Sequence, residues 1–301
     1  MQYMGLVNRY AVNRTLVKEE RDRRLDRRNR FDGEPVYQLG IVRLNSSYIE
    51  LVDKYFAWKG LASTVALVSA AMVLWMISDI FFVSLSVPGR LGEDWPYLVA
   101  FLVMGTPVLA GAGWLLYKDS FAYTHYPIRL NRKTRMVYVF RLDGTVLSVP
   151  WDEVFFCIAS LPQGDWEIQA HVLDPDGVTV KETFALSYYT STSGLPVLER
   201  YWEFVRRYME EGPEDAAGRV EIFMPVADRK ETVANGFHRM HAEFGDNAIM
   251  VLLGAALALI LVPGRWLAMR TSKIPVWPSE IEEVCRVEPN DPYARDATTL
   301  P

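Results

Sequence analysis

The sequence predicts an α+β membrane protein, and three observations carry that prediction. Two long uncharged runs follow one another within residues 60–117, short alternating segments fill residues 118–215, and a further apolar run lies within 247–269. Long apolar runs are typical of membrane helices, and alternation is typical of half-buried antiparallel strands. We therefore expect a transmembrane helical hairpin, a β-barrel or sandwich capped by a C-terminal helix, and a third membrane helix.

Changes in composition divide the 301 residues into six segments. In order, they are a cytosolic N-terminal arm at 1–59, the hairpin at 60–117, a soluble domain at 118–215, a connector at 216–246, a third membrane segment at 247–269 and a tail at 270–301. The arm begins with an arginine-rich stretch that lacks the apolar core of a signal peptide, so we expect the amino terminus to stay in the cytosol. Within it, Glu19 and Glu20 precede arginines by four residues, which predicts an exposed helix over residues 18–30.

The hairpin is defined by the absence of charge. From Gly60 to Gly89 the only charged residue is Asp79, and none occurs from Pro96 to Tyr117. Crossing a hydrocarbon core takes roughly 20 apolar residues, so each run is long enough. Basic residues flank the pair on both sides, whereas the loop between the runs contains only Arg90. The positive-inside rule therefore places both flanks in the cytosol.

Asp79 admits two interpretations. An ionisable side chain inside a membrane is a candidate functional group, and this one would serve a transporter or a membrane-embedded enzyme. Asp79 also lies near the outer end of its run, where a carboxylate can reach headgroup water. The sequence leaves both open, with the second preferred.

The third apolar run, residues 248–262, ends at Pro263 and Gly264. We expect it to span the membrane. Lysine and arginine are about as frequent before the run as after it, so the charge rule leaves the side of the tail open.

The soluble domain is predicted from alternation and turns. Asp-Gly pairs at 143–144 and 176–177 separate apolar alternations, which is a strong hairpin signal. An amphipathic helix is expected from Leu195 to Glu211. Its apolar face comprises Leu198, Tyr201, Trp202, Val205 and Tyr208, and the strands expected before it are PIRL, MVYVFR, TVLSVPW, EVFFCIA, WEIQAHVL and VTVKETFAL.

Several of these stretches resemble known families. The run RLNRKTRMVYVFRLDGTVLSVPWDEV resembles the first strands of bacterial pleckstrin-homology-like domains. The stretches YWEFVRRYMEEGP and VWPSEIEEVCRVEPNDPY are similar to a proteobacterial family of multi-pass membrane proteins of unknown function, often encoded beside effectors of the type VI secretion system. That resemblance implies a bacterial inner-membrane protein with an immunity or secretion-accessory role. It supplies no active site.

Motifs for catalysis or cofactors are missing from the sequence. A net charge of −5 and a pI near 5.5 argue against a nucleic-acid partner. Cys157 and Cys285 form no C-x-x-C pair, and His238 and His241 lack the Glu and the spacing of a zinc helix. No phosphate-binding loop and no G-x-S-x-G elbow occurs. We therefore expect no enzyme, no metal and no cofactor.

Basic residues gather at the first turn of the soluble domain, at Arg129, Arg132, Lys133 and Arg135. They are candidates for contact with lipid headgroups, although the positive-inside rule alone would also explain them. The preferred function is a membrane-anchored protein-interaction module, such as an immunity or accessory protein for a type VI effector, that acts by binding and occlusion. Its expected partners are membrane lipids and a toxin or effector. The alternatives are a transporter or membrane enzyme using Asp79, and a structural, homo-oligomeric subunit of an envelope assembly.

Overall fold

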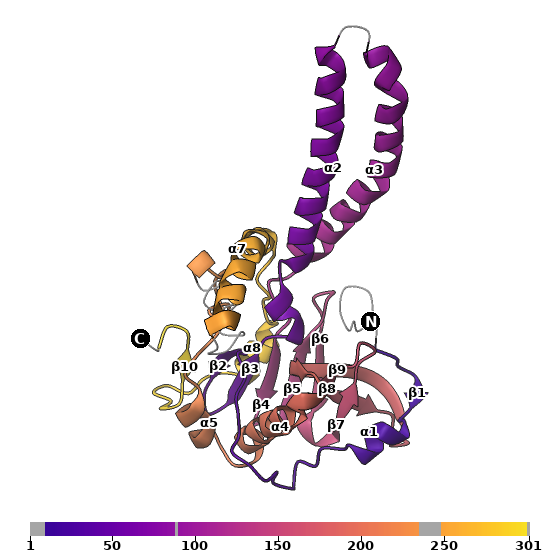
Figure 1. Cartoon of the computed structure of the whole chain (residues 1–301). Coiled ribbons are helices and arrows are strands. Elements are labelled where there is room, and N and C mark those ends of the chain that lie inside the picture. The colour runs from indigo at the N-terminus through magenta and orange to yellow at the C-terminus, as the bar shows by residue number, and fades with distance from the viewer. Residues whose placement is uncertain (1–9, 88–89, 235–247, 300–301) are drawn as a thin grey trace. The chain divides into compact units, whose positions relative to one another are not determined.

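The structure is a computed structural model that describes residues 10–87, 90–234 and 248–299 (Figure 1). The chain forms two compact units. The first, here called the β unit, comprises Met1–Ala57, His125–Arg229 and Ile274–Pro301. The second, the helical unit, comprises Trp58–Thr124 and Lys230–Lys273. The helical unit is therefore made of two insertions into the sequence of the β unit.

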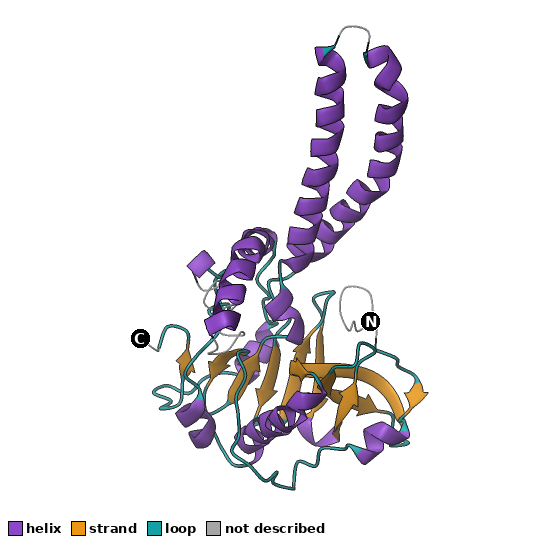
Figure 2. Ribbon diagram, viewed as in Figure 1, coloured by secondary structure: helices purple, strands orange, loops and turns teal. Residues whose placement is uncertain are grey.

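Two antiparallel sheets form the β unit (Figure 2). The first has six strands in the order β10-β2-β3-β4-β5-β6, and the second has four in the order β1-β9-β8-β7. The six-stranded sheet comprises β2 (Ile41–Leu44), β3 (Tyr48–Leu51), β4 (Ile128–Asn131), β5 (Met136–Phe140), β6 (Val146–Pro150) and β10 (Arg295–Asp296). The four-stranded sheet comprises β1 (Arg14–Thr15), β7 (Val154–Ser160), β8 (Trp166–Leu173) and β9 (Thr179–Thr190).

The six strands expected between residues 126 and 186 are confirmed as β4 to β9, as is the helix after them, α4 (Leu195–Glu210). Short 3-10 turns at η1 (Lys54–Trp58), η2 (Trp151–Glu153) and η3 (Thr192–Gly194) connect other elements. The five residues predicted on the apolar face of α4 are all buried. Alternation and turn chemistry were sufficient here because each strand pairs with its neighbour in sequence.

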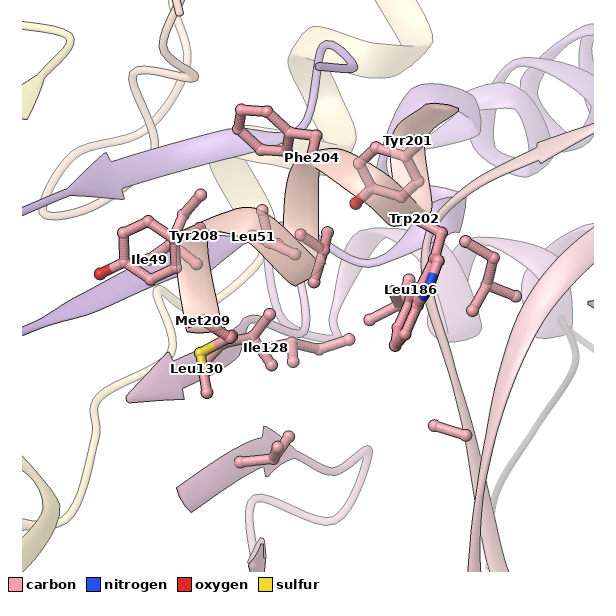
Figure 3. Close-up of a cluster of buried hydrophobic side chains, with 14 of the residues drawn as sticks. Ile49, Leu51, Ile128, Leu130, Leu186, Tyr201, Trp202, Phe204, Tyr208 and Met209 are labelled. Atoms are coloured by element: carbon pink, nitrogen blue, oxygen red, sulfur yellow. The ribbon is translucent and has the colours of Figure 1, made fainter. Parts of the chain in front are cut away.

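The core lies where α4 packs on the sheets (Figure 3). Trp202 of α4 stacks on Trp151, with ring centroids 5.8 Å apart, and also contacts the ring of Phe156 on β7. Ile49, Leu51 and other inward residues of β3 and β4 complete the core. Aromatic side chains of this size dominate the apolar area that a domain of this size buries.

The N-terminal arm differs from the expectation of an exposed helix over residues 18–30. Helix α1 covers only Lys18–Asp22, because the Glu20 carboxylate pairs backward with Arg14 (2.5 Å) instead of forward with Arg24. Arg24 bridges to Cys157 on β7, and the Arg23 carbonyl accepts a hydrogen bond from the Ile158 amide (3.1 Å). The arm thus covers one edge of the four-stranded sheet at β7 and, through β1, the other at β9.

The tail also belongs to the β unit. Helix α8 (Ser279–Val284) and strand β10 hold it, and β10 pairs with β2. Trp277, Ile281 and Cys285 are buried. A further short helix, α5 (Glu214–Arg219), follows α4.

The helical unit contains α2 (Leu61–Ser86), α3 (Leu91–Ser120) and α7 (Ala248–Thr271). By length and hydropathy, two helical segments among the described residues qualify as membrane spans, Lys54–Ser86 and Gly92–Ser120. Within their most apolar windows only 6% and 11% of the residues are buried. Helix α7 continues through Pro263, where its apolar run was expected to end. Residues 235–247 of the expected connector and third segment lie outside the described residues.

Candidate functional site

A pocket opens in the β unit between β4 and β5 on one side and β9 on the other. Its volume is about 100 Å³, and its walls are mostly apolar. The apolar lining includes Ile128, Val139, Phe140, Leu142 and Phe184. Ligand sites commonly combine such walls with a few polar groups at fixed positions.

Beside the pocket lies a buried group of Tyr10, Lys54 and Glu167. The Lys54 ammonium pairs with the Glu167 carboxylate and donates to the Tyr10 hydroxyl (3.0 Å), which donates to Glu167 (2.8 Å). Burial, together with the Glu167 charge, raises the pKa of the Tyr10 phenol well above its ordinary value. Tyr10 therefore stays protonated, and the lysine charge is neutralised by an adjacent carboxylate. The group fixes the shape of the pocket and offers no free nucleophile.

Arg141 is the second cation of the pocket lining. One of its terminal nitrogens donates to Glu182 (2.8 Å), while its Nε is enclosed and has no hydrogen-bond partner among the described residues. The pocket therefore combines mostly apolar walls with two cationic residues, Lys54 and Arg141.

A second buried cluster contains Cys157, His171 and Glu20. Cys157 Sγ lies 3.5 Å from His171 Nε2, and His171 Nδ1 contacts the Thr183 hydroxyl (2.8 Å). Cysteine and histidine at this distance are the parts of a thiol nucleophile. Here burial and the Glu20 charge raise the pKa of the Cys157 thiol, and the residue is fully enclosed. The cluster therefore packs the arm onto the sheet. Among the described residues, no three His, Cys, Asp or Glu side chains are grouped to hold a metal ion.

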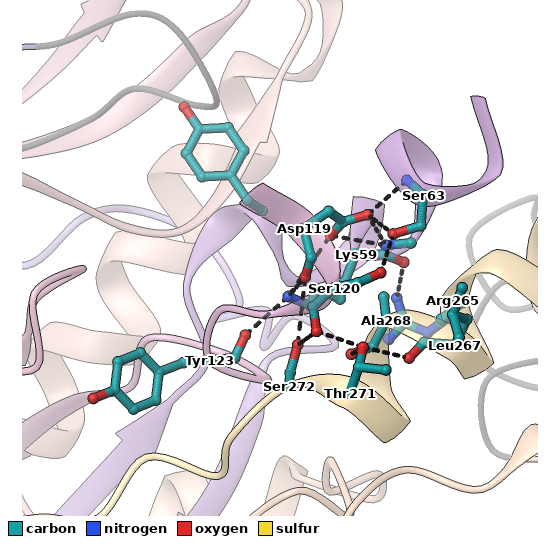
Figure 4. A network of polar contacts seen from close by, with 12 residues as sticks. Lys59, Ser63, Asp119, Ser120, Tyr123, Arg265, Leu267, Ala268, Thr271 and Ser272 are labelled. Carbon is teal, nitrogen blue, oxygen red and sulfur yellow. Dashed lines mark hydrogen bonds and ion pairs between the residues drawn. The ribbon is translucent and has the colours of Figure 1, made fainter. Parts of the chain in front are cut away.

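The helical unit has its own buried polar cluster, at the ends of α2, α3 and α7 (Figure 4). The Asp119 carboxylate accepts hydrogen bonds from the amides of Gly60 (3.1 Å) and Ser63 (2.9 Å), and so caps the first turn of α2. Lys59 lies 3.6 Å from the same carboxylate and donates to the Tyr123 carbonyl (2.9 Å). These contacts fix the N-terminal end of α2 to the C-terminal end of α3.

Helix α7 joins this cluster through its C-terminal half. Arg265 is buried, pairs with Glu231 (2.6 Å) and donates to the Lys59 carbonyl (3.2 Å). Gly60 and Gly264 allow the close approach, because a Cβ on Gly60 would lie 2.2 Å from the Arg265 Cα and one on Gly264 would lie 2.0 Å from the Thr64 hydroxyl. Neither glycine can therefore be enlarged without moving α7 away from α2.

The basic residues proposed for headgroup contact do not form one surface. Arg129 was predicted wrongly, because its side chain is 1% exposed, pairs with Glu50 (2.6 Å) and lies 4.6 Å from the Trp277 ring. From sequence alone, a charged residue on a sheet is expected to face solvent, because the segment that covers it is not known. Here the tail covers Arg129, and it lies more than 140 residues away in the sequence. Arg132 is half-buried.

The other two basic residues reach the surface but are paired. Lys133 pairs with Glu288 of the tail, and Arg135 binds both Asp152 (2.6 Å) and Glu210 (2.9 Å). Because carboxylates already surround these cations, the turn presents less positive potential than its sequence indicates.

Asp79 is exposed on α2 and stands apart from the clusters of the helical unit. It follows Ser63 by sixteen residues, which is about 24 Å along a helix. The structure therefore brings no second ionisable group of that cluster to Asp79.

Sequence reasoning missed Lys54, Tyr10 and Glu167. The available signal was the second face of β8, where Glu167, Gln169 and His171 alternate with apolar residues and are nevertheless all buried. Polar residues at alternate positions normally indicate a solvated face. Here the N-terminal arm covers that face, and its short strand and helix carry little periodicity.

Comparison with known proteins gives one match. The model of a family of unknown function, DUF6708, matches residues 106–289, which are more than half of the chain. No curated protein and no solved structure matches. The matched stretch includes β4 to β9, which are half of the six-stranded sheet and three strands of the four-stranded one, together with α4, α7 and α8. This chain belongs to the DUF6708 family of unknown function.

Proposed function

We propose that the chain is a membrane-anchored binding protein, in which α2 and α3 cross the inner membrane of a bacterium and the β unit binds a protein partner in the cytosol. One observation carries the anchoring: large apolar side chains cover the outside of the hairpin. Trp75, Phe82 and Met104 are 67%, 66% and 73% exposed.

Such exposure argues against water as the solvent of these helices. Soluble monomers rarely leave contiguous apolar patches larger than a few hundred Å² in water. Each large apolar side chain moved out of water contributes about 1.5–3 kcal/mol, and the hairpin exposes more than a dozen. Lipid chains are the surroundings that account for both helices at once.

The sheet register supports two crossings. Leu51 on β3 pairs directly with Ile128 on β4, and the hairpin is inserted between these two residues. Both ends of the insertion therefore start from one folded sheet. Two crossings return the chain to its starting compartment, whereas one crossing would separate paired strands.

Aromatic residues at the helix ends agree with this arrangement. Trp58 and Tyr117 lie at the ends of α2 and α3 nearer the β unit in sequence, and Trp95 lies near the loop. All three are exposed, as is typical of side chains at the level of the headgroups. The basic flanks support a cytosolic β unit under the positive-inside rule.

For the binding role, the pocket is the supporting feature. It is mostly apolar and open, and Arg141 is part of its lining, so it would accept an apolar side chain of a partner. The resemblance to pleckstrin-homology-like domains and to proteins encoded near type VI effectors suggests a toxin or effector as that partner. Binding would then block the toxin by occlusion.

Membrane anchoring is tested by fractionation of cells that produce the full chain. Val68→Arg together with Leu102→Arg places one charge in each span, and each arginine costs roughly 2.5–3.5 kcal/mol at the centre of a membrane helix. We expect the wild type to resist alkaline extraction and the double variant to be lost from the membrane. The matched control is Leu142→Arg, an exposed leucine of the β unit, which should not change the fractionation. A wild-type chain extracted at alkaline pH would refute the anchoring.

Partner binding is tested by coexpressing the chain with a type VI effector encoded beside its gene. Leu142 lines the pocket and is 41% exposed, so Leu142→Arg should reduce copurification and protection at least tenfold while the chain stays folded and membrane-bound. If the wild type neither copurifies with the effector nor reduces its toxicity, the immunity role is wrong and the anchoring remains.

A further inference from the structure

The chain leaves the β unit after Arg229 and re-enters it at Ile274. On its return the tail is tightly integrated. Glu282 pairs with Arg129 (2.9 Å), Asp291 accepts from the Ser46 amide (2.7 Å), and β10 pairs with β2. The residues before Arg229 and those after Ile274 therefore belong to one folded unit, so they must lie in the same compartment.

This connectivity restricts α7. A single crossing by α7 would put the tail and the β unit on opposite sides of the membrane. Two crossings would need a second apolar segment between Arg229 and α7, but residues 235–247 read NGFHRMHAEFGDN and include Arg239, Glu243 and Asp246. Each such charge at mid-membrane costs roughly 2.5–3.5 kcal/mol. The connectivity therefore argues against a crossing by the helix expected as a third span.

The contacts of α7 agree with a position at the ends of the other helices. Thr271 donates to the Ser120 carbonyl and the Lys273 amide donates to the Ala122 carbonyl (2.9 Å). On α2 the buried residues Ser63, Thr64 and Ala66 all lie in the first two turns, followed only by Ser84 near the far end. Helix α7 therefore packs against the first turns of α2 and the last turns of α3, near the cytosolic side of the proposed spans.

Helix α7 has two distinct faces. Gly254, Ala258, Leu261 and Ala268 recur every three, four or seven residues and are buried within the protein. The opposite face is apolar as well, yet exposed, with Leu252 and Leu259 each 72% and Ile260 61% exposed. This exposed apolar stripe continues toward the N-terminal end of α2 and the C-terminal end of α3. Lipid is the partner that fits such a stripe beside the proposed spans.

We propose that α7 is an interfacial helix that lies along the cytosolic leaflet, with Leu252, Leu259 and Ile260 in the acyl chains. Trp266 and Arg270 lie at the level of the headgroups, next to the N-terminal end of α2 and the C-terminal end of α3. The chain then has two spans, and the arm, the β unit and the tail all face the cytosol. This proposal rests on the anchoring proposed above and specifies the topology of the same protein.

Cysteine labelling with a membrane-impermeant maleimide tests the topology. The single variants are Gly92→Cys in the first turn of α3 beside the hairpin loop, Gln163→Cys in the β unit and Ala294→Cys in the tail, all at exposed positions. The unmodified chain is the control, because Cys157 and Cys285 are buried. We expect Gly92→Cys to react in spheroplasts, and the other two variants to react only after the membrane is permeabilised.

The labelling pattern that would contradict the position of α7 differs from the pattern that would contradict the membrane anchoring. If Ala294→Cys reacts in spheroplasts while Gln163→Cys does not, α7 crosses the membrane and the inference is wrong, while the anchoring stands. If Gly92→Cys is protected like Gln163→Cys, the hairpin itself does not cross and the proposed anchoring fails.

Depth measurement tests the lipid contact of α7 independently. Leu252 and Leu259 lie seven residues apart, which is about 10 Å along a helix axis. Spin labels at Leu252→Cys and Leu259→Cys, with the full chain in phosphatidylglycerol and phosphatidylethanolamine vesicles, should report the same shallow depth. Depths that differ by most of 10 Å would indicate a crossing helix, and accessibility to water at both sites would exclude contact with lipid.

Discussion

The two units of this chain place the same kind of residue in opposite surroundings. In the β unit, Trp151 and Trp202 are almost completely buried and stack on each other. In the hairpin, Trp75 and Trp114 are 67% and 46% exposed. Protein covers the two tryptophans of the β unit, whereas the two of the hairpin are left uncovered by the rest of the chain. The contribution of a large apolar side chain to the free energy of unfolding therefore depends on which unit contains it.

Charged residues follow the opposite rule. The β unit encloses several ion pairs, such as Lys54 with Glu167 and Arg129 with Glu50. The hairpin from residue 61 to 117 has Asp79 and, beside its loop, Glu93 and the pair of Arg90 with Asp94 (3.0 Å). A sheet can bury a charge when another segment supplies its partner, whereas two adjacent helices in lipid have few partners to offer.

The largest difference is expected when one substitution is made in both units. Trp202→Ala removes a core side chain and should cost about 3–5 kcal/mol of the free energy of unfolding of the β unit. Trp75→Ala should change that free energy by less than about 0.5 kcal/mol. Urea unfolding in detergent, followed by the circular dichroism of the strands, measures both. Equal losses would mean that the units do not unfold independently.

The next effect concerns the tail. Arg129→Ala leaves the buried Glu50 carboxylate without its cation, which should cost about 3 kcal/mol and loosen the contact with Glu282. We expect limited proteolysis to cut the tail near Arg286 in the variant much faster than in the wild type. Lys133→Ala removes an exposed pair to the same tail and is the control. If both variants are cut at the wild-type rate, Arg129 does not hold the tail.

Local pattern was enough to predict much of this fold. Strands β4 to β9 and α4 were found because Asp-Gly turns, alternation and helical periodicity are all local signals. Strands β2 and β3 were missed because each has four residues and no adjacent turn of that strength, and β10 has two. Strand β3 pairs with β4 and β2 pairs with β10 of the tail, and these partners lie far away in the sequence.

The candidate site was less accessible to prediction for the same reason. Arg129 looked like a surface cation until the tail covered it, and Glu167 looked like a solvated strand residue until Tyr10 and Lys54 closed over it. Burial of a charge is a long-range property, because it depends on which remote segment packs above it. The hairpin needed no such information, since its length and apolar composition are local properties of the sequence.

A moderate, pH-dependent effect is expected at Glu203 on α4. Burial opposes its ionisation, but hydrogen bonds from Arg206, Arg207 and the Phe31 amide lower its pKa to about 2. A carboxylate with a depressed pKa stabilises the fold above its ordinary value of 4.5, and this contribution is lost as the pH falls toward 2.

Glu203→Gln removes that contribution. At pH 7 the variant should be about 2 kcal/mol less stable than the wild type, and the difference should shrink steadily between pH 4.5 and pH 2. Chemical unfolding of both proteins across this range measures it. A difference that stays constant with pH would show that Glu203 stabilises the fold by packing alone.

The smallest effect is expected at the paired surface cations. Arg135→Ala should change the free energy of unfolding by at most about 1 kcal/mol, because the side chain is 37% exposed and its pairs with Asp152 and Glu210 are screened. The same variant tests headgroup contact, for which a matched substitution is available in Asp152→Asn. If carboxylates neutralise this turn, then with the full chain in phosphatidylglycerol vesicles Asp152→Asn should strengthen the contact of this turn with the headgroups, and Arg135→Ala should weaken it by less than twofold. A tenfold loss on removing Arg135 would instead establish the headgroup contact that its position in the sequence suggested, and would show that lipid competes successfully with both carboxylates.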